Sequence, residues 1–324
     1  MADSGKKTAA PRTSAEPRAI FLMGPTASGK TALAIELRRR FPVDLISVDS
    51  AQVYRGMDIG TAKPSLEERA AVAHHLIDIA DPDEQYDAAR FVADALAAIE
   101  KIAARNKTVL LTGGTGLYLK ALLEGLFEAL PADKAIRDRL QARLAKEGRA
   151  ALHAELGRID PAAGARIHPN DTQRLLRGLE IFQACGRTWT ELVEEQKRAG
   201  QGGAVFSRVF QAGLRCKKTE LHERIARRSV AMLDSGLIEE VERLRQEGYG
   251  PELASMQAIG YRHGNKFLDG EWSRAEMTEQ LIIDTRKYAK RQMTWFSANK
   301  ELHWFARTDH AALAEAIAHA LLSE

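Results

Sequence analysis

The chain has 324 residues, 45% of them hydrophobic and 28% charged, a balance typical of a globular protein. This length predicts one large domain or a main domain with an insertion, and no apolar run approaches the roughly 20 residues that a membrane span requires. The formal net charge of +3 is too small to identify a polyanionic partner, and the two cysteines, Cys185 and Cys216, exclude a disulfide framework or a four-cysteine zinc site. We therefore expect a cytoplasmic protein, and we expect a monomer because nothing indicates an obligate interface.

The first 17 residues are polar and lack the apolar core of a secretory signal, which predicts a disordered leader over 1–17. The apolar run Ala19–Met23 then predicts a strand, and the apolar pattern of Ala32–Leu37 predicts a helix. Between them, GPTASGKT at Gly24–Thr31 matches the phosphate-binding pattern G-x-x-x-x-G-K-[ST] in its required strand–loop–helix context.

Backbone N–H groups of such a loop, together with the helix N-terminus, bind a diphosphate. Lys30 would add a positive charge to the phosphate oxygens, and the Thr31 hydroxyl would bind Mg²⁺. Nucleotide-binding proteins share this loop, so by itself it does not identify which diphosphate is held.

Strand and helix patterns alternate along residues 18–130. Strands are predicted at Asp44–Asp49, His75–Ile79 and Thr108–Thr112, with an amphipathic helix at Ala88–Arg105. This alternation predicts a parallel sheet, and ligands of such sheets bind at the carboxyl ends of the strands. The phosphate loop, Asp49 and the turn Gly113–Gly116 should therefore lie along one edge of the sheet.

The pattern changes at about residue 131, and from there to about residue 203 it is helical without a convincing strand. The α/β pattern then resumes with a strand at Phe206–Leu214, helices at Lys218–Gln246 and Ser273–Phe296, a strand at Leu302–Phe305 and a helix from Ala311. We predict an α/β fold with a P-loop NTPase-like parallel sheet flanked by helices. Its core would comprise 18–130 and 204–324, with an all-helical insertion at 131–203.

Asp49 ends a predicted strand beside the phosphate loop and admits three roles. It could join a Mg²⁺ shell, act as a general base for an incoming nucleophile, or cap the turn that follows. Sequence alone does not choose among these. Gly113–Gly116 offers a tight turn with exposed N–H groups and the Thr115 hydroxyl, although a plain strand-to-helix turn explains it equally well.

Two clusters combine the residue types that contact RNA. Asp171–Arg177 places Arg174 and Arg177 three residues apart on one helix, and Arg286–Phe296 interleaves four cations with Tyr, Trp and Phe. Cations suit phosphates, and aromatic rings and Arg planes suit unstacked bases. The alternative for both is a solvated helix face. A third stretch, Thr219–Leu233, carries arginines of which one or more could reach the phosphates.

Several strings, taken together and in order, identify a resemblance. GPTASGKTALAIEL, LISVDSAQVYRGMDIGTAKP, GGTGLYLKALLEGL, RIHPNDTQRLLRGLE, IGYR and KRQMTWF closely resemble the bacterial tRNA dimethylallyltransferases, also called isopentenyltransferases. The resemblance runs from about Ala19 to Phe305, and DSAQVYRGMDIGTAKP is its most specific part.

The resemblance implies that the phosphate loop holds the diphosphate of dimethylallyl diphosphate and that the prenyl group passes to the exocyclic N6 amine of the adenosine 3′-adjacent to the anticodon. It implies that Asp49 is the general base, that Thr115 positions the reacting groups and that Arg228 contacts the diphosphate beside Lys30. The implied diphosphate-binding residues are Gly24, Pro25, Thr26, Ala27, Ser28, Gly29, Lys30 and Thr31.

The resemblance also implies a set of tRNA contacts, shared between the base pocket, the insertion and the C-terminal helices. Its members are Asp49, Ser50, Ala51, Gln52, Thr115, Arg137, Gln173, Arg174, Leu175, Leu176, Arg177, Gln257, Ala258, Ile259, Gly260, Tyr261, Arg262, Lys290, Arg291, Gln292, Met293, Thr294, Trp295 and Phe296. The expected cofactor is Mg²⁺, the expected partners are the tRNA anticodon stem-loop and dimethylallyl diphosphate, and no membrane is expected.

Two other functions remain open from the residues. A P-loop kinase would share the loop, the Mg²⁺ and the fold, and would turn over ATP without prenyl transfer. A non-catalytic RNA-binding protein that retains an unused phosphate loop would bind tRNA, and this binding would not require Asp49.

Overall fold

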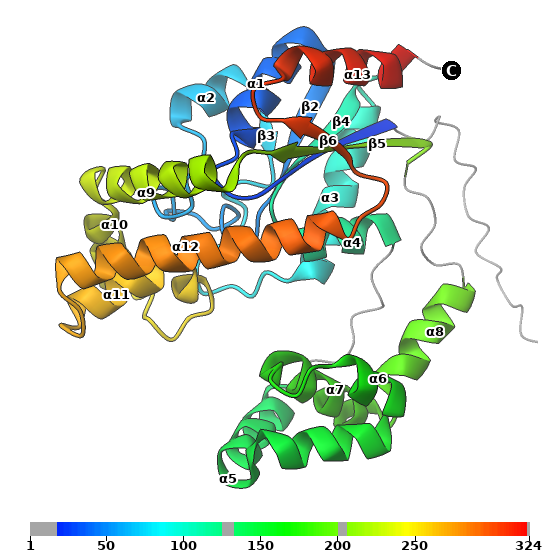
Figure 1. Cartoon of the computed structure of the whole chain (residues 1–324), viewed down its shortest axis with the longest axis vertical. Coiled ribbons are helices and arrows are strands. Elements are labelled where there is room, and N and C mark those ends of the chain that lie inside the picture. Colours follow the sequence, from blue (N-terminus) through cyan, green and yellow to red (C-terminus); the bar gives the residue numbers. More distant parts are fainter. Residues whose placement is uncertain (1–17, 125–132, 200–205, 323–324) are drawn as a thin grey trace, which may run out of the picture. The chain divides into compact units, whose positions relative to one another are not determined.

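The structure is a computed structural model that describes residues 18–124, 133–199 and 206–322. The predicted leader at 1–17 lies outside the described residues. Within them, six parallel strands form one sheet in the order β3-β2-β4-β1-β5-β6, as Figure 1 shows. The strands are β1 (Arg18–Met23), β2 (Val43–Val48), β3 (His74–His75), β4 (Thr108–Gly113), β5 (Arg208–Arg215) and β6 (His303–Ala306). The predicted parallel α/β sheet is confirmed.

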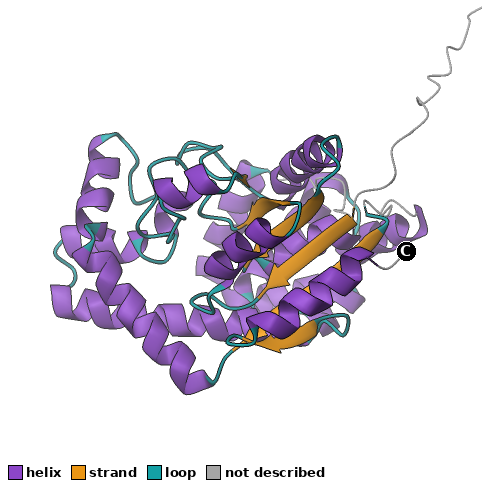
Figure 2. Ribbon diagram, turned by 90° about the horizontal axis from the view of Figure 1, so that it is seen from above, coloured by secondary structure: helices purple, strands orange, loops and turns teal. Residues whose placement is uncertain are grey.

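The central strands are buried almost throughout, which explains their nearly continuous apolar sequences. Every residue of β2 is buried, as are the last five of β1. Parallel strands have this composition because helices cover both faces of the sheet, and Figure 2 shows helices flanking the strands. On one face, Ile20 and Leu22 of β1 share a cluster with α1 (Lys30–Arg40) and α13 (His310–Leu322).

The strand predicted at His75–Ile79 is wrong in extent, since β3 contains only His74 and His75. Leu76 and Asp78 have positive φ angles of 64° and 55°, which take the chain out of the extended conformation. Asp78 instead lies in a polar network described below. Apolar alternation alone could not reveal this turn.

Between β5 and β6 the core contains four α-helices and a short 3₁₀ helix. They are α9 (Lys218–Asp234), α10 (Leu237–Gln246), η1 (Ser255–Gln257), α11 (Tyr261–Leu268) and α12 (Arg274–Ser297). The helical region expected at Lys218–Gln246 is broken at Gly236, whose φ is 97°. α9 and α12 pack side by side (Figure 1). The N-terminal part of the chain also contains the helices α2 (Leu66–Ala71), α3 (Ala88–Ala103) and α4 (Gly116–Glu124).

The chain divides into two compact units. The α/β unit contains residues up to Tyr86, Asp94–Gly116 and Val205 onward, and the helical unit contains Asp87–Ala93 and Leu117–Ala204. The helical unit includes α5 (Lys134–Ile159), α6 (Pro161–Arg166), α7 (Thr172–Cys185) and α8 (Trp189–Ala199). The insertion boundaries at 131 and 203 fall outside the described residues.

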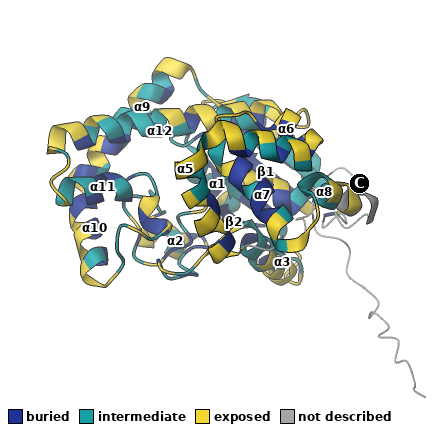
Figure 3. Cartoon of the chain, turned by 90° about the horizontal axis from the view of Figure 1, so that it is seen from below, coloured by how far each residue is buried: buried dark blue, intermediate teal, exposed yellow. Residues whose placement is uncertain are grey.

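The helical unit has a core of its own. Leu140, Leu152 and Leu156 of α5 pack against Leu175 and Leu179 of α7, and all five are fully buried. Figure 3 shows buried positions along one side of α7 and exposed positions elsewhere on these helices. No helix in the part of the chain that the structure describes is long and apolar enough to cross a membrane.

Candidate active site

The loop Gly24–Thr31 joins β1 to α1 and is curled around the Lys30 side chain. The Lys30 ammonium donates hydrogen bonds to the carbonyl oxygens of Gly24 and Pro25, at 2.8 and 2.7 Å. Positive φ angles at Ala27 (64°) and Gly29 (96°) turn the backbone into the helix. The Ser28 hydroxyl is buried and has no hydrogen-bond partner among the described residues. An unpaired buried hydroxyl is costly, so the loop fits a ligand rich in acceptor oxygens.

Two arginines of α9 reach this loop from a distant part of the sequence. The Arg228 guanidinium donates to the Thr26 hydroxyl, and Arg224 Nε donates to the Ala27 carbonyl oxygen at 2.7 Å. Burial, with the nearby Arg228 charge, lowers the pKa of Lys30 to about 7, against the opposing effect of Asp49. Burial also lowers the pKa of Arg228. A diphosphate bound in this loop would supply negative charge to these partly desolvated cations, so the loop suits such a ligand.

Asp49 follows β2 and lies at the edge of the sheet where the phosphate loop begins. Both Val48 at the end of β2 and Met23 at the end of β1 are in register with Gly113 of β4. The predicted convergence of the three strand ends is confirmed. Asp49 Oδ1 accepts hydrogen bonds from the backbone N–H groups of Ala51 (2.9 Å) and Gln52 (3.2 Å). Oδ2 has no hydrogen-bond partner in the described part of the chain, which leaves it available to accept a proton.

The turn after β4 brings Thr115 to Asp49. The Thr115 hydroxyl accepts a hydrogen bond from the Ser50 N–H at 3.2 Å, and the Thr115 N–H donates to the Val48 carbonyl at 3.3 Å. A Cβ at Gly113 would lie 2.1 Å from the Val48 carbonyl oxygen. Glycine is therefore required there by the close approach of the Val48 backbone.

Gln292 of α12 connects the two loops. Its Oε1 accepts from the Thr26 N–H at 2.7 Å, and its Nε2 donates to the Gly114 carbonyl at 2.9 Å. The family resemblance placed Gln292 among the tRNA contacts, within the stretch Lys290–Phe296. Its side chain is buried and bridges the phosphate loop to the Gly113–Gly116 turn, so the geometry indicates a role in holding the site together.

Sequence reasoning counted Tyr288 only among the aromatic residues of the Arg286–Phe296 cluster and did not place it beside Asp49. It lies one helical turn before Gln292, and burial together with the Asp49 charge raises the pKa of its hydroxyl to about 12, despite hydrogen bonds with Thr115 and Gln292. The hydroxyl is therefore protonated at neutral pH, and its pKa responds to the Asp49 charge. Its four-residue spacing from Gln292 places the two side chains on the same face of the helix, and this spacing is a sequence signal for a shared site.

Only some of the residues predicted to contact tRNA in the stretch Lys290–Phe296 are exposed. Lys290, Arg291 and Thr294 are exposed, whereas Phe296 is fully buried. Met293 and Trp295 are half-buried, and the Trp295 ring lies so close to Gly116 that a Cβ there would come within 2.4 Å of it. Of the nucleic-acid contacts predicted in this stretch, those of the exposed members are compatible with the structure, whereas the buried Phe296 has a packing role.

The stretch Gln257–Arg262 surrounds the start of α11. Gln257 is exposed, Ala258 and Ile259 are half-buried, and Gly260 is buried. Tyr261 is fully buried and its hydroxyl donates to Glu240 Oε1 at 2.6 Å. Arg262 pairs with Asp284 at 2.6 Å. Tyr261 and Gly260 therefore act in packing.

In the helical unit, Gln173 and Arg174 are exposed on α7, whereas Leu175 and Leu176 are buried in its core. Arg137 and Arg177 both pair with the buried carboxylate of Glu180, at 3.2 and 3.0 Å. A buried carboxylate needs such partners, so both arginines have a structural role. Half of the Arg137 side chain and about a quarter of the Arg177 side chain stay exposed.

Thr31 is the only predicted metal ligand, and it is half-buried in the first turn of α1. Among the described residues, no group of three or more His, Cys, Asp or Glu side chains could hold a metal ion. Arg228 also lines a cavity of about 330 Å³ between residues 58–69 and α9, with Lys63 and Arg69 among its other lining residues.

Comparisons with known proteins agree on one family. The family model described as IPP transferase matches residues 52–299. The chain is 47% identical to the tRNA dimethylallyltransferase of Desulfotalea psychrophila over 298 residues, covering 92% of this chain and 94% of the relative. It is 50% identical to the enzyme of the same name from Burkholderia ambifaria over 281 residues, covering 86% and 87%.

Solved structures give the same result. The full-length tRNA isopentenylpyrophosphate transferase of Bacillus halodurans superimposes with a TM-score of 0.69 at 38% identity, covering 94% of this chain and 96% of the other. A eukaryotic dimethylallyltransferase, described as acting on tRNA, gives a TM-score of 0.75 at 28% identity, covering 94% and 78%.

Proposed function

Since this chain belongs to the IPP transferase family, we propose that it transfers the dimethylallyl group of dimethylallyl diphosphate to a tRNA adenosine. The acceptor is the exocyclic N6 amine of the adenosine 3′-adjacent to the anticodon in a subset of tRNAs, and the second product is diphosphate. The observation that carries this proposal is the convergence of Asp49, Thr115 and the phosphate loop at adjoining strand ends.

Asp49 is the general base in this proposal. The amine nitrogen bonds to the allylic carbon, the bond from that carbon to the diphosphate oxygen breaks with its electron pair leaving on the diphosphate, and the N–H proton passes to Asp49. Two backbone N–H groups hold Oδ1, so Oδ2 is the oxygen that receives the proton. General-base assistance of this kind contributes typically about 10²- to 10⁴-fold.

The phosphate loop holds the leaving group. Lys30, Arg228 and backbone N–H groups at the helix end of the loop stabilise the negative charge that develops on the diphosphate. The Thr31 hydroxyl would hold Mg²⁺ together with phosphate oxygens and waters, and the bound ion would supply further positive charge. An oxygen ligand at this position of the loop fits magnesium, because the Ser or Thr of a phosphate-binding loop is a usual Mg²⁺ ligand.

The target base must leave the stacked anticodon loop to reach Asp49, since the enzyme acts on an atom of the base itself. Ser50, Ala51 and Gln52 form the base-contacting stretch beside Asp49. The exposed residues Gln173, Arg174, Gln257, Lys290, Arg291 and Thr294 contact the tRNA, and the helical segment 131–203 is a tRNA-contacting domain.

We place the activity in the cytoplasm, where tRNA is used, and we propose that the active protein is a monomer.

The test is incubation of the protein with labelled dimethylallyl diphosphate, Mg²⁺ and unmodified tRNA, followed by nucleoside analysis. The parent should yield N6-(dimethylallyl)adenosine, and Asp49→Asn should lower the rate by about 10²-fold or more, because it removes the proton acceptor. tRNA binding should be retained. Asp309→Asn, which alters an exposed carboxylate at the start of α13, is the matched control.

ATP turnover by the parent without prenyl transfer would contradict the proposal and identify a kinase. Full activity of Asp49→Asn would contradict the assignment of the base.

A further inference from the structure

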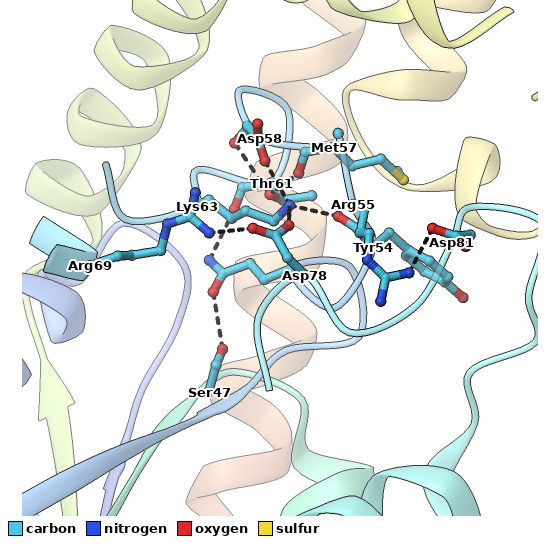
Figure 4. Close-up of polar contacts among 12 residues, drawn as sticks. Ser47, Tyr54, Arg55, Met57, Asp58, Thr61, Lys63, Arg69, Asp78 and Asp81 are labelled. Atoms are coloured by element: carbon cyan, nitrogen blue, oxygen red, sulfur yellow. Dashed lines mark hydrogen bonds and ion pairs between the residues drawn. The ribbon is translucent and has the colours of Figure 1, made fainter. Parts of the chain in front are cut away.

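A buried lysine lies outside the residues assigned to the reaction. Only 1% of the Lys63 side chain is exposed, and its ammonium donates to the Tyr54 carbonyl (2.6 Å), Asp58 Oδ1 (2.7 Å) and Asp78 Oδ1 (2.5 Å). Figure 4 shows these three contacts converging on one nitrogen. All three donors of the ammonium are therefore used, as a buried charge requires.

The contacts of Lys63 close a loop of the chain onto itself. The Tyr54 carbonyl and the Lys63 ammonium bring the two ends of residues 54–63 together. Inside the loop, the Thr61 hydroxyl donates to the Met57 carbonyl at 2.7 Å, and the Lys63 N–H donates to the Asp58 carbonyl at 3.0 Å. Outside it, the buried Glu240 carboxylate accepts from the N–H groups of residues 58–60 at 2.9 to 3.2 Å. The carbonyl groups at Thr61 and Ala62 are thereby held in place.

Those two carbonyls hold Gln52. Gln52 Nε2 donates to the carbonyl oxygens of Thr61 (3.2 Å) and Ala62 (3.3 Å), and Oε1 accepts from the Ser47 hydroxyl at 3.0 Å. The carboxamide is thus bound at both ends by this chain. Gln52 therefore braces the loop against β2 with its side chain, while its backbone N–H holds Asp49 Oδ1.

We propose that Lys63 is a positioning residue for Asp49, acting through the loop 54–63 and the Gln52 side chain. This inference rests on the proposed function, because Asp49 is the base only in that reaction. The three hydrogen bonds of the Lys63 ammonium all go to groups of this chain. The Lys63 ammonium fixes the loop, and the loop fixes the Thr61 and Ala62 carbonyl groups. These carbonyl groups orient the Gln52 side chain. The N–H groups of Ala51 and Gln52 then hold Asp49 Oδ1, so that Oδ2 points toward the adenosine amine.

The test is single-turnover prenyl transfer from saturating labelled dimethylallyl diphosphate to saturating tRNA. Lys63→Met removes the charge and retains the length, and it should slow the transfer by about 10- to 100-fold, the effect expected when a reacting group moves by about 1 Å. The dissociation constants for tRNA and dimethylallyl diphosphate should change by less than about threefold. Lys101→Met, at an exposed lysine of α3, is the matched control and should match the parent.

A double-mutant cycle tests the route. If Lys63 acts through Gln52, then Gln52→Ala should also slow the transfer, and combining it with Lys63→Met should cost little more than either single change. Multiplicative effects would reject this route. Asp58→Ala removes one acceptor of the ammonium at a half-exposed residue. It should slow the transfer by about threefold or more, and it keeps the test usable if Lys63→Met does not fold.

An unchanged transfer rate in folded Lys63→Met, or a slower rate accompanied by an equal loss of tRNA affinity, would overturn the inference. Failure of the parent and Lys101→Met to modify tRNA would instead overturn the proposed function, so the two failures are distinct.

Discussion

At the scale of single residues, the two oxygens of Asp49 have different environments. Oδ1 is held by two backbone N–H groups, whereas Oδ2 is open. A carboxylate whose only role was to cap the turn would need Oδ1 but not Oδ2. Burial and the Asp49 charge raise the pKa of the Tyr288 hydroxyl, which therefore stays protonated while Asp49 is charged. Asp49 thus combines the capping role with the general-base role that we propose for it.

Lys30→Ala should weaken binding of dimethylallyl diphosphate by about tenfold or more, since hydrogen bonds to charged groups contribute about 1.5 to 3 kcal/mol. Isothermal titration calorimetry with Mg²⁺ present measures this directly. Lys101→Ala is the matched control, because Lys101 is exposed on α3. An affinity equal to that of the parent, in a variant with an unchanged melting temperature, would count against the diphosphate assignment of the loop.

At the scale of elements, glycines set how closely the loop 54–63 approaches α11. A Cβ at Gly60 would lie 2.5 Å from Tyr261 Cε2, and Tyr261 is fully buried with its hydroxyl on Glu240. The tyrosine cannot move aside without losing this hydrogen bond. The backbone amides of the loop bind the same carboxylate, so the loop, α10 and α11 form one packed junction.

Gly60→Ala should therefore destabilise the fold by about 1 to 3 kcal/mol through overpacking. Gly157→Ala is the control, since a Cβ there meets no atom within 4 Å on helix α5, and it should be neutral or slightly stabilising. Urea unfolding curves of the two variants give the comparison. Equal midpoints would mean that Tyr261 is not confined as described.

The strand β3 illustrates where element prediction failed. His75–Ile79 has the apolar pattern of a strand, but the left-handed residues Leu76 and Asp78 end it after His75. Asp78 instead pairs with Lys63 and Arg69. Tertiary ion pairing thus overrides the local preference for extended backbone at this position.

At the scale of the whole molecule, exposed cations occur in both units. Arg174 on α7 and Arg291 on α12 are exposed, while their neighbours Leu175 and Gln292 are buried. Because the net charge is only +3, a tRNA site depends on such local groups more than on the overall charge.

Arg174→Ala and Arg291→Ala should each weaken tRNA binding and reduce the slope of log K against log salt by about 1, as expected for loss of one phosphate contact. Filter binding at several salt concentrations measures both quantities. Arg40→Ala is the control, since Arg40 pairs with Glu36 within α1. A salt slope equal to that of the parent would reject the contact concerned.

The sequence by itself determined the parallel α/β fold, the phosphate loop, the place of Asp49 at a strand end and the family. These depend on local periodicity, glycine positions and short motifs, which act over a few residues. Only the tertiary structure decided which residues of the two predicted RNA-contacting clusters are exposed. It also showed that Gln292 bonds to Thr26 across 266 residues of sequence, and that Lys63 and Glu240 hold the loop 54–63 near Asp49. The reason is physical: a side chain's partners depend on which distant segments pack against it, and one helix carries both buried and exposed positions.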